Sequence, residues 1–194
     1  MGYFGPKDLI RPEALLAFEQ TGKYILEPKI DGIFAELTIG SPNQFISKND
    51  NPIRKSLLDG LELLSFPAEL CGSVFLCEVE TGTEWATKRR RDRGHTLLWI
   101  HSIIRLGSKL YRDVPYLQNK QKLQEIYNSF NPELKKRAIL VTYDTDDFYR
   151  NYRRIQRDIC YEGAVLKDVS IGMIGENGQG KTWAWKKVKD FPRH

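Results

Sequence analysis

Residues 25–37 read Ile-Leu-Glu-Pro-Lys-Ile-Asp-Gly-Ile-Phe-Ala-Glu-Leu, a stretch that contains Lys29. Residues 23–29 have the pattern of a short strand, which puts Glu27 and Lys29 on one face. Asp31-Gly32 is a tight-turn pair, so residues 33–39 are predicted to return as the second strand of a hairpin. A lysine beside a turn glycine is usually just solvated, whereas the other interpretation is a nucleophilic amine. Later motifs must decide between them.

The composition indicates an ordinary globular protein with a positive charge. The 194 residues are 41% hydrophobic and 11% aromatic, which predicts one domain with a core of its own. The net charge of +5 favours a polyanionic partner such as nucleic acid. There is neither an apolar run of membrane-spanning length nor a signal-peptide core at the N-terminus. We therefore expect no membrane contact, no secretion, and a cytoplasmic location, or a nuclear one in a eukaryote.

Three cysteines, Cys71, Cys77 and Cys160, show neither paired metal spacing nor a disulfide framework. They are predicted to be reduced thiols.

Short strands and scattered helices account for the remaining patterns. Helical spacing of apolar residues predicts helices over residues 12–21, 53–64, 123–130 and 148–159. Further strands are predicted over residues 44–47, 73–80, 97–105, 138–143, 162–168 and 182–189. This order lacks regular strand–helix alternation, so it predicts an α+β domain with antiparallel sheets flanked by helices.

Residues 175–182, Gly-Glu-Asn-Gly-Gln-Gly-Lys-Thr, match the letters of a phosphate-binding loop. Such a loop needs a helix that begins at the lysine, followed by further parallel strands. Only 12 residues follow Thr182, and they have the pattern of a strand. A glycine-rich hairpin turn is the better interpretation.

Two groups of charged residues are further candidates. Glu78 and Glu80 share one face at the end of a strand, which suits a cation or a ribose hydroxyl, or else is a simple exposed strand end. A basic cluster follows, which is either a solvated loop or a surface for a phosphate backbone. Its members are Lys88, Arg89, Arg90, Arg91 and Arg93.

Five short motifs, taken together and in order, resemble those of the covalent nucleotidyltransferases, the polynucleotide ligases and capping enzymes. They occupy residues 27–32, 47–49, 76–80, 162–167 and 185–189. These are similar, in turn, to the family's Lys-x-Asp-Gly, Ser-Arg-Asn/Gly, Glu-ending strand, Glu-Gly-hydrophobic-Lys and Trp-x-Lys-x-Lys motifs. The nearest resemblance is to the catalytic domain of ATP-dependent DNA ligases. It implies a ligase/capping-enzyme nucleotidyltransferase (ATP-grasp-like) domain over residues 1–194.

The resemblance implies that Lys29 attacks the α-phosphate of ATP to form Lys-AMP, and that AMP then passes to a 5′-phosphate at a nick. Mg²⁺ would be held by Glu78 and Glu162. The nucleotide-binding residues that it implies are Glu27, Ile30, Ser47, Lys48, Glu78, Trp99, Lys187 and Lys189. The expected partner is nicked duplex DNA, or RNA, contacted through the basic cluster by a monomer.

The chain also departs from the ligase pattern. Phe34 stands where ligases usually have arginine, and Ile100-His101 stands for their Phe-Asp strand motif, so Trp99 is the candidate for stacking on adenine. Ligases carry an OB-fold domain after the last lysine pair, whereas this chain ends at His194. The sequence is therefore expected to be a truncated piece, a naturally minimal protein, or a fragment completed by an OB-fold domain or subunit in trans. The alternatives are an RNA ligase or capping-type enzyme, and a nick- or end-binding module without the chemistry.

Overall fold

The computed structural model describes residues 8–81, 96–158, 161–172 and 185–189. These residues form two compact units. The first unit contains Asp31–Arg112 and Gln118–Leu140, and the second contains the chain up to Ile30, Asp113–Leu117 and the chain from Val141 onward.

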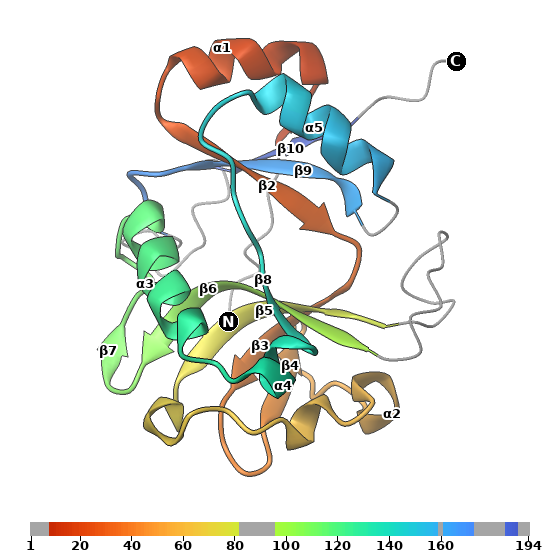
Figure 1. Ribbon diagram of the computed structural model, residues 1–194, viewed down its shortest axis with the longest axis vertical. Helices are drawn as coiled ribbons and strands as arrows, with labels where there is room; N and C mark the ends of the chain where they lie inside the picture. Colours follow the sequence, from red (N-terminus) through yellow and green to blue (C-terminus); the bar gives the residue numbers. More distant parts are fainter. Residues whose placement is uncertain (1–7, 82–95, 159–160, 173–184, 190–194) are drawn as a thin grey trace. The chain divides into compact units, whose positions relative to one another are not determined.

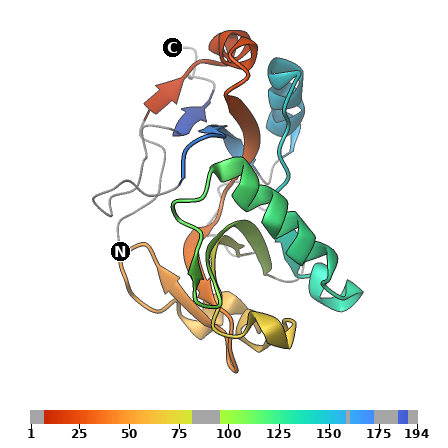
Figure 2. The same cartoon turned by 90° about the vertical axis from the view of Figure 1, so that its left-hand side faces the viewer.

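The second unit is built on a four-stranded sheet with the order β1-β10-β9-β2. Its elements are β1 (Asp8–Ile10), a 3-10 turn (Pro12–Ala14), α1 (Leu15–Gln20), β2 (Tyr24–Ile30), α5 (Phe148–Arg157), β9 (Tyr161–Asp168) and β10 (Trp185–Val188). β9 pairs antiparallel with both β2 and β10, whereas β1 pairs parallel with β10. Both helices lie on the same side of this sheet (Figures 1 and 2).

Alternation along the strands explains this arrangement. The residues that face the helices are apolar and fully buried, among them Leu26, Leu166 and Val188, and they pack with Leu15 and Phe148 of the two helices. Successive strand residues point to opposite faces, so the intervening positions face away from the helices. The second face of the sheet therefore carries the remaining, mostly polar, side chains.

The first unit contains a sheet with the order β4-β3-β5-β6-β7, and β8 pairs parallel with β6 beside this path. Its strands are β3 (Ile33–Thr38), β4 (Gln44–Ser47), β5 (Val74–Glu80), β6 (Leu97–Leu106), β7 (Lys109–Leu110) and β8 (Ala138–Leu140). Its helical elements are α2 (Lys55–Leu58), two 3-10 turns (Leu61–Leu63 and Ala68–Leu70), most of α3 (Tyr116–Asn128) and α4 (Pro132–Lys135).

The predicted hairpin around Asp31-Gly32 is wrong. β2 is a strand, as predicted, but it pairs with β9, whereas β3 pairs with β4 and β5 in the other sheet. The chain passes from one unit to the other between Ile30 and Asp31. A turn pattern in the sequence indicates only a local change of chain direction. Which sheet each strand joins depends on its pairing with strands that are distant in the sequence.

The helix predicted over residues 53–64 is also only partly correct. It breaks after Leu58, because Asp59 and Gly60 both adopt left-handed backbone angles, with φ of 48° and 82°. The other predicted strands and helices appear, some of them shorter than predicted, where the structure describes the chain. The α+β class with mainly antiparallel sheets is confirmed.

Some predictions fall outside the described residues, namely the basic cluster of residues 88–93, the glycine-rich residues 175–182 and Cys160. Cys71 and Cys77 are free thiols, one exposed and one buried. Within the part of the chain that the structure describes, no helix combines the length and apolar character needed to cross a membrane.

Candidate active site

The face of the second unit's sheet that points away from the helices brings several motif residues together. Lys29 pairs with Gly163, and Val188 pairs with Ala164, so Lys189 follows β10 directly beside Gly163. Residues paired in register point to the same face of a sheet. Glu27 and Lys187 both pair with Val165, so by this rule they point to the same face as Lys29.

A β-bulge places Glu162 between two lysines. Lys29 pairs with Gly163 and Ile30 with Tyr161, so Glu162 is the extra residue without a partner on β2. Bulges bend the strand locally and redirect a side chain, and they are common beside active sites. Here Oε1 of Glu162 accepts a hydrogen bond from Nζ of Lys29, and Oε2 accepts one from Nζ of Lys189.

The three charges form a partly open cluster with a net positive charge. The side chains of Lys29, Glu162 and Lys189 are 19%, 32% and 35% exposed, so solvent reaches all three. Burial acts to raise the pKa of Glu162, but the hydrogen bonds from Lys189 and Lys29 outweigh it and lower the pKa. The carboxylate is therefore ionised at neutral pH, and the cluster can receive an anion.

Gly163 allows the end of β10 and the Lys189 side chain to lie close against β9. Its φ of +142° is a conformation that residues with a side chain rarely adopt. A Cβ at this position would lie 2.5 Å from the carbonyl oxygen of Val188 and 3.1 Å from Cγ of Lys189. The Glu-Gly pair thus has two physical roles. Glu162 supplies the carboxylate of the cluster, and Gly163 leaves room for Val188 and the Lys189 side chain.

Next to this cluster lies a fully buried polar network. Nζ of Lys167 donates to Oε2 of Glu27 and to the phenol oxygen of Tyr116, both at 2.7 Å. The Tyr116 hydroxyl in turn donates to Oε1 of Glu27 at 3.0 Å. The three residues are at most 3% exposed. The Lys167 ammonium also lies 4.3 Å from the centroid of the Trp185 ring.

Burial, together with the neighbouring Glu27 carboxylate, raises the pKa of Tyr116 well above its ordinary value of 10. The phenol therefore keeps its proton and can donate to Glu27 while it accepts from Lys167.

Sequence reasoning did not assign roles to three of these residues. Lys167 and Trp185 belong to two of the quoted motifs, and their position on the Lys29 face follows from the two-residue period, so this signal was present. Tyr116 carries no such signal. It begins α3, about 90 residues from Glu27 in sequence, and only the tertiary structure brings the two together.

Four of the expected nucleotide-binding residues lie in the first unit. Glu78 is half-buried on β5, in register with Trp99 of β6. A Cβ on Gly32 would lie 3.1 Å from Oε2 of Glu78, so this glycine permits a close approach to the carboxylate. Ser47 ends β4, and the exposed Lys48 follows it.

Trp99 is only 7% exposed, and its indole N–H donates to Oε2 of Glu80 at 2.7 Å. Most of the ring that was expected to stack on adenine is thus covered in this structure. Ile30, in the second unit, is fully buried.

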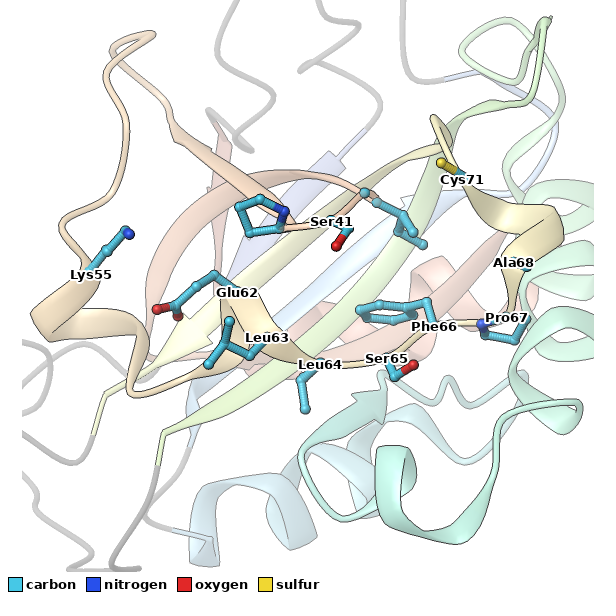
Figure 3. Close-up of a pocket in the computed structure, with 13 residues that line it drawn as sticks. Ser41, Lys55, Glu62, Leu63, Leu64, Ser65, Phe66, Pro67, Ala68 and Cys71 are labelled. Carbon is cyan, nitrogen blue, oxygen red and sulfur yellow. The ribbon is translucent and has the colours of Figure 1, made fainter.

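A surface pocket of about 630 Å³ lies in the first unit and contains none of the expected site residues (Figure 3). Its walls come from residues 39–42 and 62–68, with Lys55 and Cys71.

Comparisons with known proteins identify the fold. No protein-family model matches the sequence, and a search of curated proteins finds no match. Among solved structures, the chain has the fold of the adenylation, or nucleotidyltransferase, domain of ATP-dependent DNA and RNA ligases, at low sequence identity. One is a mycobacterial DNA ligase D complexed with ATP and MES, with a TM-score of 0.65 and 12% identity over 87% of this chain and 55% of that one.

Two further ligases extend the comparison. The ATP-dependent DNA ligase from bacteriophage T7, in complex with ATP, has a TM-score of 0.58 and 18% identity over 96% of this chain and 68% of that one. An archaeal ATP-dependent RNA ligase has a TM-score of 0.59 and 13% identity over 95% of this chain and 48% of that one. The chain spans about half the length of the first of these structures.

Proposed function

We propose that this chain is the adenylation domain of an ATP-dependent polynucleotide ligase and that Lys29 is its nucleophile. The observation that carries the proposal is the cluster of Lys29, Glu162 and Lys189, which joins three separate sequence motifs on one face of a sheet with the ligase fold.

The reaction transfers AMP from ATP to Lys29. The Lys29 ammonium first gives up one proton, which frees the lone pair of Nζ. The nitrogen then forms a bond to the α-phosphorus while the bond from that phosphorus to the bridging oxygen breaks, so pyrophosphate leaves, and the nitrogen loses its second proton to give the neutral phosphoramidate N–H. Glu162 accepts a hydrogen bond from Nζ and is the nearest carboxylate to receive the proton. Lys189 remains to offset negative charge on the phosphate.

The donor set fits a magnesium ion that is held mainly by the phosphates of its nucleotide. Mg²⁺ in such sites uses one or two carboxylates together with phosphate oxygens and water. Each carboxylate oxygen of Glu162 accepts one hydrogen bond from an ammonium group and keeps another lone pair for a metal ion. Glu78 is the second candidate metal ligand. Among the described residues, no three or more His, Cys, Asp or Glu gather as a metal cage. When bound, the ion would offset the charge of the phosphates.

The other nucleotide contacts are assigned by resemblance. Glu27 and Lys187 share the sheet face of Lys29. Ile30 is buried, so its contact would be through the backbone. Ser47, Lys48 and Trp99 complete the set.

The proposed nucleic-acid substrate is nicked duplex DNA. AMP passes from Lys29 to a 5′-phosphate, and the 3′-hydroxyl at the nick then displaces it. The basic cluster of residues 88–93 would contact the phosphates of the duplex. An RNA substrate is the second candidate, which the similarity to an archaeal RNA ligase favours.

The test is incubation with Mg²⁺ and ATP, then with GTP, followed by intact-mass analysis. The wild-type chain should gain AMP, and Lys29→Ala should gain none. Lys23→Ala is the matched control, since Lys23 is an exposed lysine just before the same strand, and it should label like the wild type.

Labelling only with GTP would indicate a capping-type enzyme. Equal labelling of Lys29→Ala would refute the nucleophile and point to another residue. Absence of an adduct with either nucleotide would leave a binding module without the chemistry.

A further inference from the structure

Tyr116 completes a ring of hydrogen bonds with Glu27 and Lys167, and no sequence motif predicts its place there. Lys167 donates to the phenol, the phenol donates to Glu27, and Lys167 also donates directly to Glu27. A further contact of 3.3 Å joins the phenol to Oε2 of Glu27. We propose that Tyr116 is a positioning residue of the nucleotide site, which holds Glu27 and Lys167 in one arrangement on the face that carries Lys29. This inference rests on the proposed function.

The position of the ring points to the site rather than to the core. The core of the second unit lies on the helix side of the sheet, where its strand residues are apolar. Glu27 instead points to the face of Lys29, two residues earlier on the same strand. A buried ion pair is seldom more stable than well-packed apolar residues of the same size, so stability alone is a weak explanation for it.

The phenol is suited to positioning because it is rigid. Lys167 and Glu27 have long side chains with several rotamers, and each costs free energy to hold in one conformation. The Tyr116 ring packs edge-on against Trp185, with centroids 5.6 Å apart and an angle of 69°, and lies 4.7 Å from the Lys167 ammonium. One fixed hydroxyl thus bridges two flexible charged groups of opposite sign.

The expected consequence concerns nucleotide affinity. If the hydrogen bonds among Tyr116, Glu27 and Lys167 are already formed before ATP arrives, ATP binding does not have to order these side chains. Removing the hydroxyl takes one hydrogen-bond partner from Glu27 and one from Lys167, so their remaining direct hydrogen bond is no longer fixed in place by the rigid phenol. Tyr116→Phe should raise the Kd for ATP by about tenfold, the low end of the range for loss of a hydrogen bond to a charged group. The rate of Lys-AMP formation at saturating ATP should stay within about threefold.

Affinity is best measured by isothermal titration with ATP in a Lys29→Ala background, where no covalent step can occur. Tyr152→Phe is the matched control. Tyr152 is also a buried tyrosine of the second unit, but it lies on the helix side of the sheet and accepts a hydrogen bond from Gln156 at 3.1 Å. Its loss should lower stability and leave the Kd for ATP unchanged.

A double-variant comparison separates positioning from general packing. Glu27→Gln should itself weaken ATP binding. If Tyr116 acts through Glu27, adding Tyr116→Phe to Glu27→Gln should weaken binding little further, because the same interaction is already lost.

The inference would be overturned by an unchanged Kd in Tyr116→Phe, by an equal effect of Tyr152→Phe, or by losses that multiply in the double variant. A wild-type chain that binds no ATP would overturn it too. If the chain binds ATP but forms no Lys-AMP, the proposed function fails, and the Kd series alone decides the role of Tyr116.

Discussion

Gly163→Ala is the sharpest test of how the site is built. Gly163 lies between Lys29 on β2 and Lys189 after β10, and its φ is +142°. An alanine there faces two penalties. The backbone conformation costs about 1–3 kcal/mol for a residue with a side chain. The new Cβ would also lie 2.5 Å from the Val188 carbonyl oxygen.

The steric penalty can be estimated from distances. A carbon atom normally approaches a carbonyl oxygen to about 3.3 Å. The strands would have to separate by about 0.8 Å, and both atoms belong to paired backbone that cannot rotate away. With the conformational cost, the free energy of unfolding should fall by about 2–5 kcal/mol. A shift of this size at a reacting group can slow chemistry about 100-fold, so Lys-AMP formation should fall by that order.

The measurements are urea unfolding and the rate of Lys-AMP formation by intact mass. Gly22→Ala is the control, because Gly22 also has a positive φ of 63° in the second unit but nothing within 4 Å of its Cβ position. It should lose only about 1–2 kcal/mol and keep its labelling rate. If Gly163→Ala unfolds at the same urea concentration as Gly22→Ala and labels at the wild-type rate, the close packing of β9 against β10 is not what brings Lys189 to the site.

Three further predictions follow from other contacts. Glu162→Ala should abolish Lys-AMP formation. Glu80→Ala should keep Lys-AMP formation but lower the free energy of unfolding, since Glu80 accepts a hydrogen bond from the Trp99 indole N–H. Equal losses of labelling would refute the choice of Glu162 as the carboxylate of the site. Because the folded state lowers the pKa of Glu162, its ionisation contributes stability above the ordinary value of 4.5 and that contribution disappears as pH falls through the folded-state pKa. The stability gap between wild type and Glu162→Gln in urea should therefore shrink on acidification, and a gap that widens would contradict the ion-pair assignment. Binding to duplex DNA should be independent of base sequence and fall with salt at a log–log slope of about −0.9 per phosphate contact. Changing Arg89, Arg90 and Arg91 to Ala should flatten that slope, and an unchanged slope would mean that the cluster is only solvated.

Local patterns in the sequence correctly predicted most strands. Strand alternation depends only on the two-residue period, so residues 24–30 and 161–168 could be recognised without the tertiary structure. The order of the five motifs likewise indicated the ligase fold, which the comparisons confirm. Glu162 was expected to be open to a metal; the sequence held no sign that Lys29 and Lys189 would share it.

Only the tertiary structure decided which strands pair and in which register. Asp31-Gly32 looked like a hairpin turn, yet β2 pairs with β9, more than 130 residues away, because burial of the apolar face against α1 and α5 outweighs the local turn signal. The bulge at Glu162 follows from that pairing, since an extra residue exists only relative to a partner strand. The same holds for Tyr116, whose hydroxyl reaches Glu27 from a distant segment: no local period encodes a contact between side chains that meet only when the chain has folded.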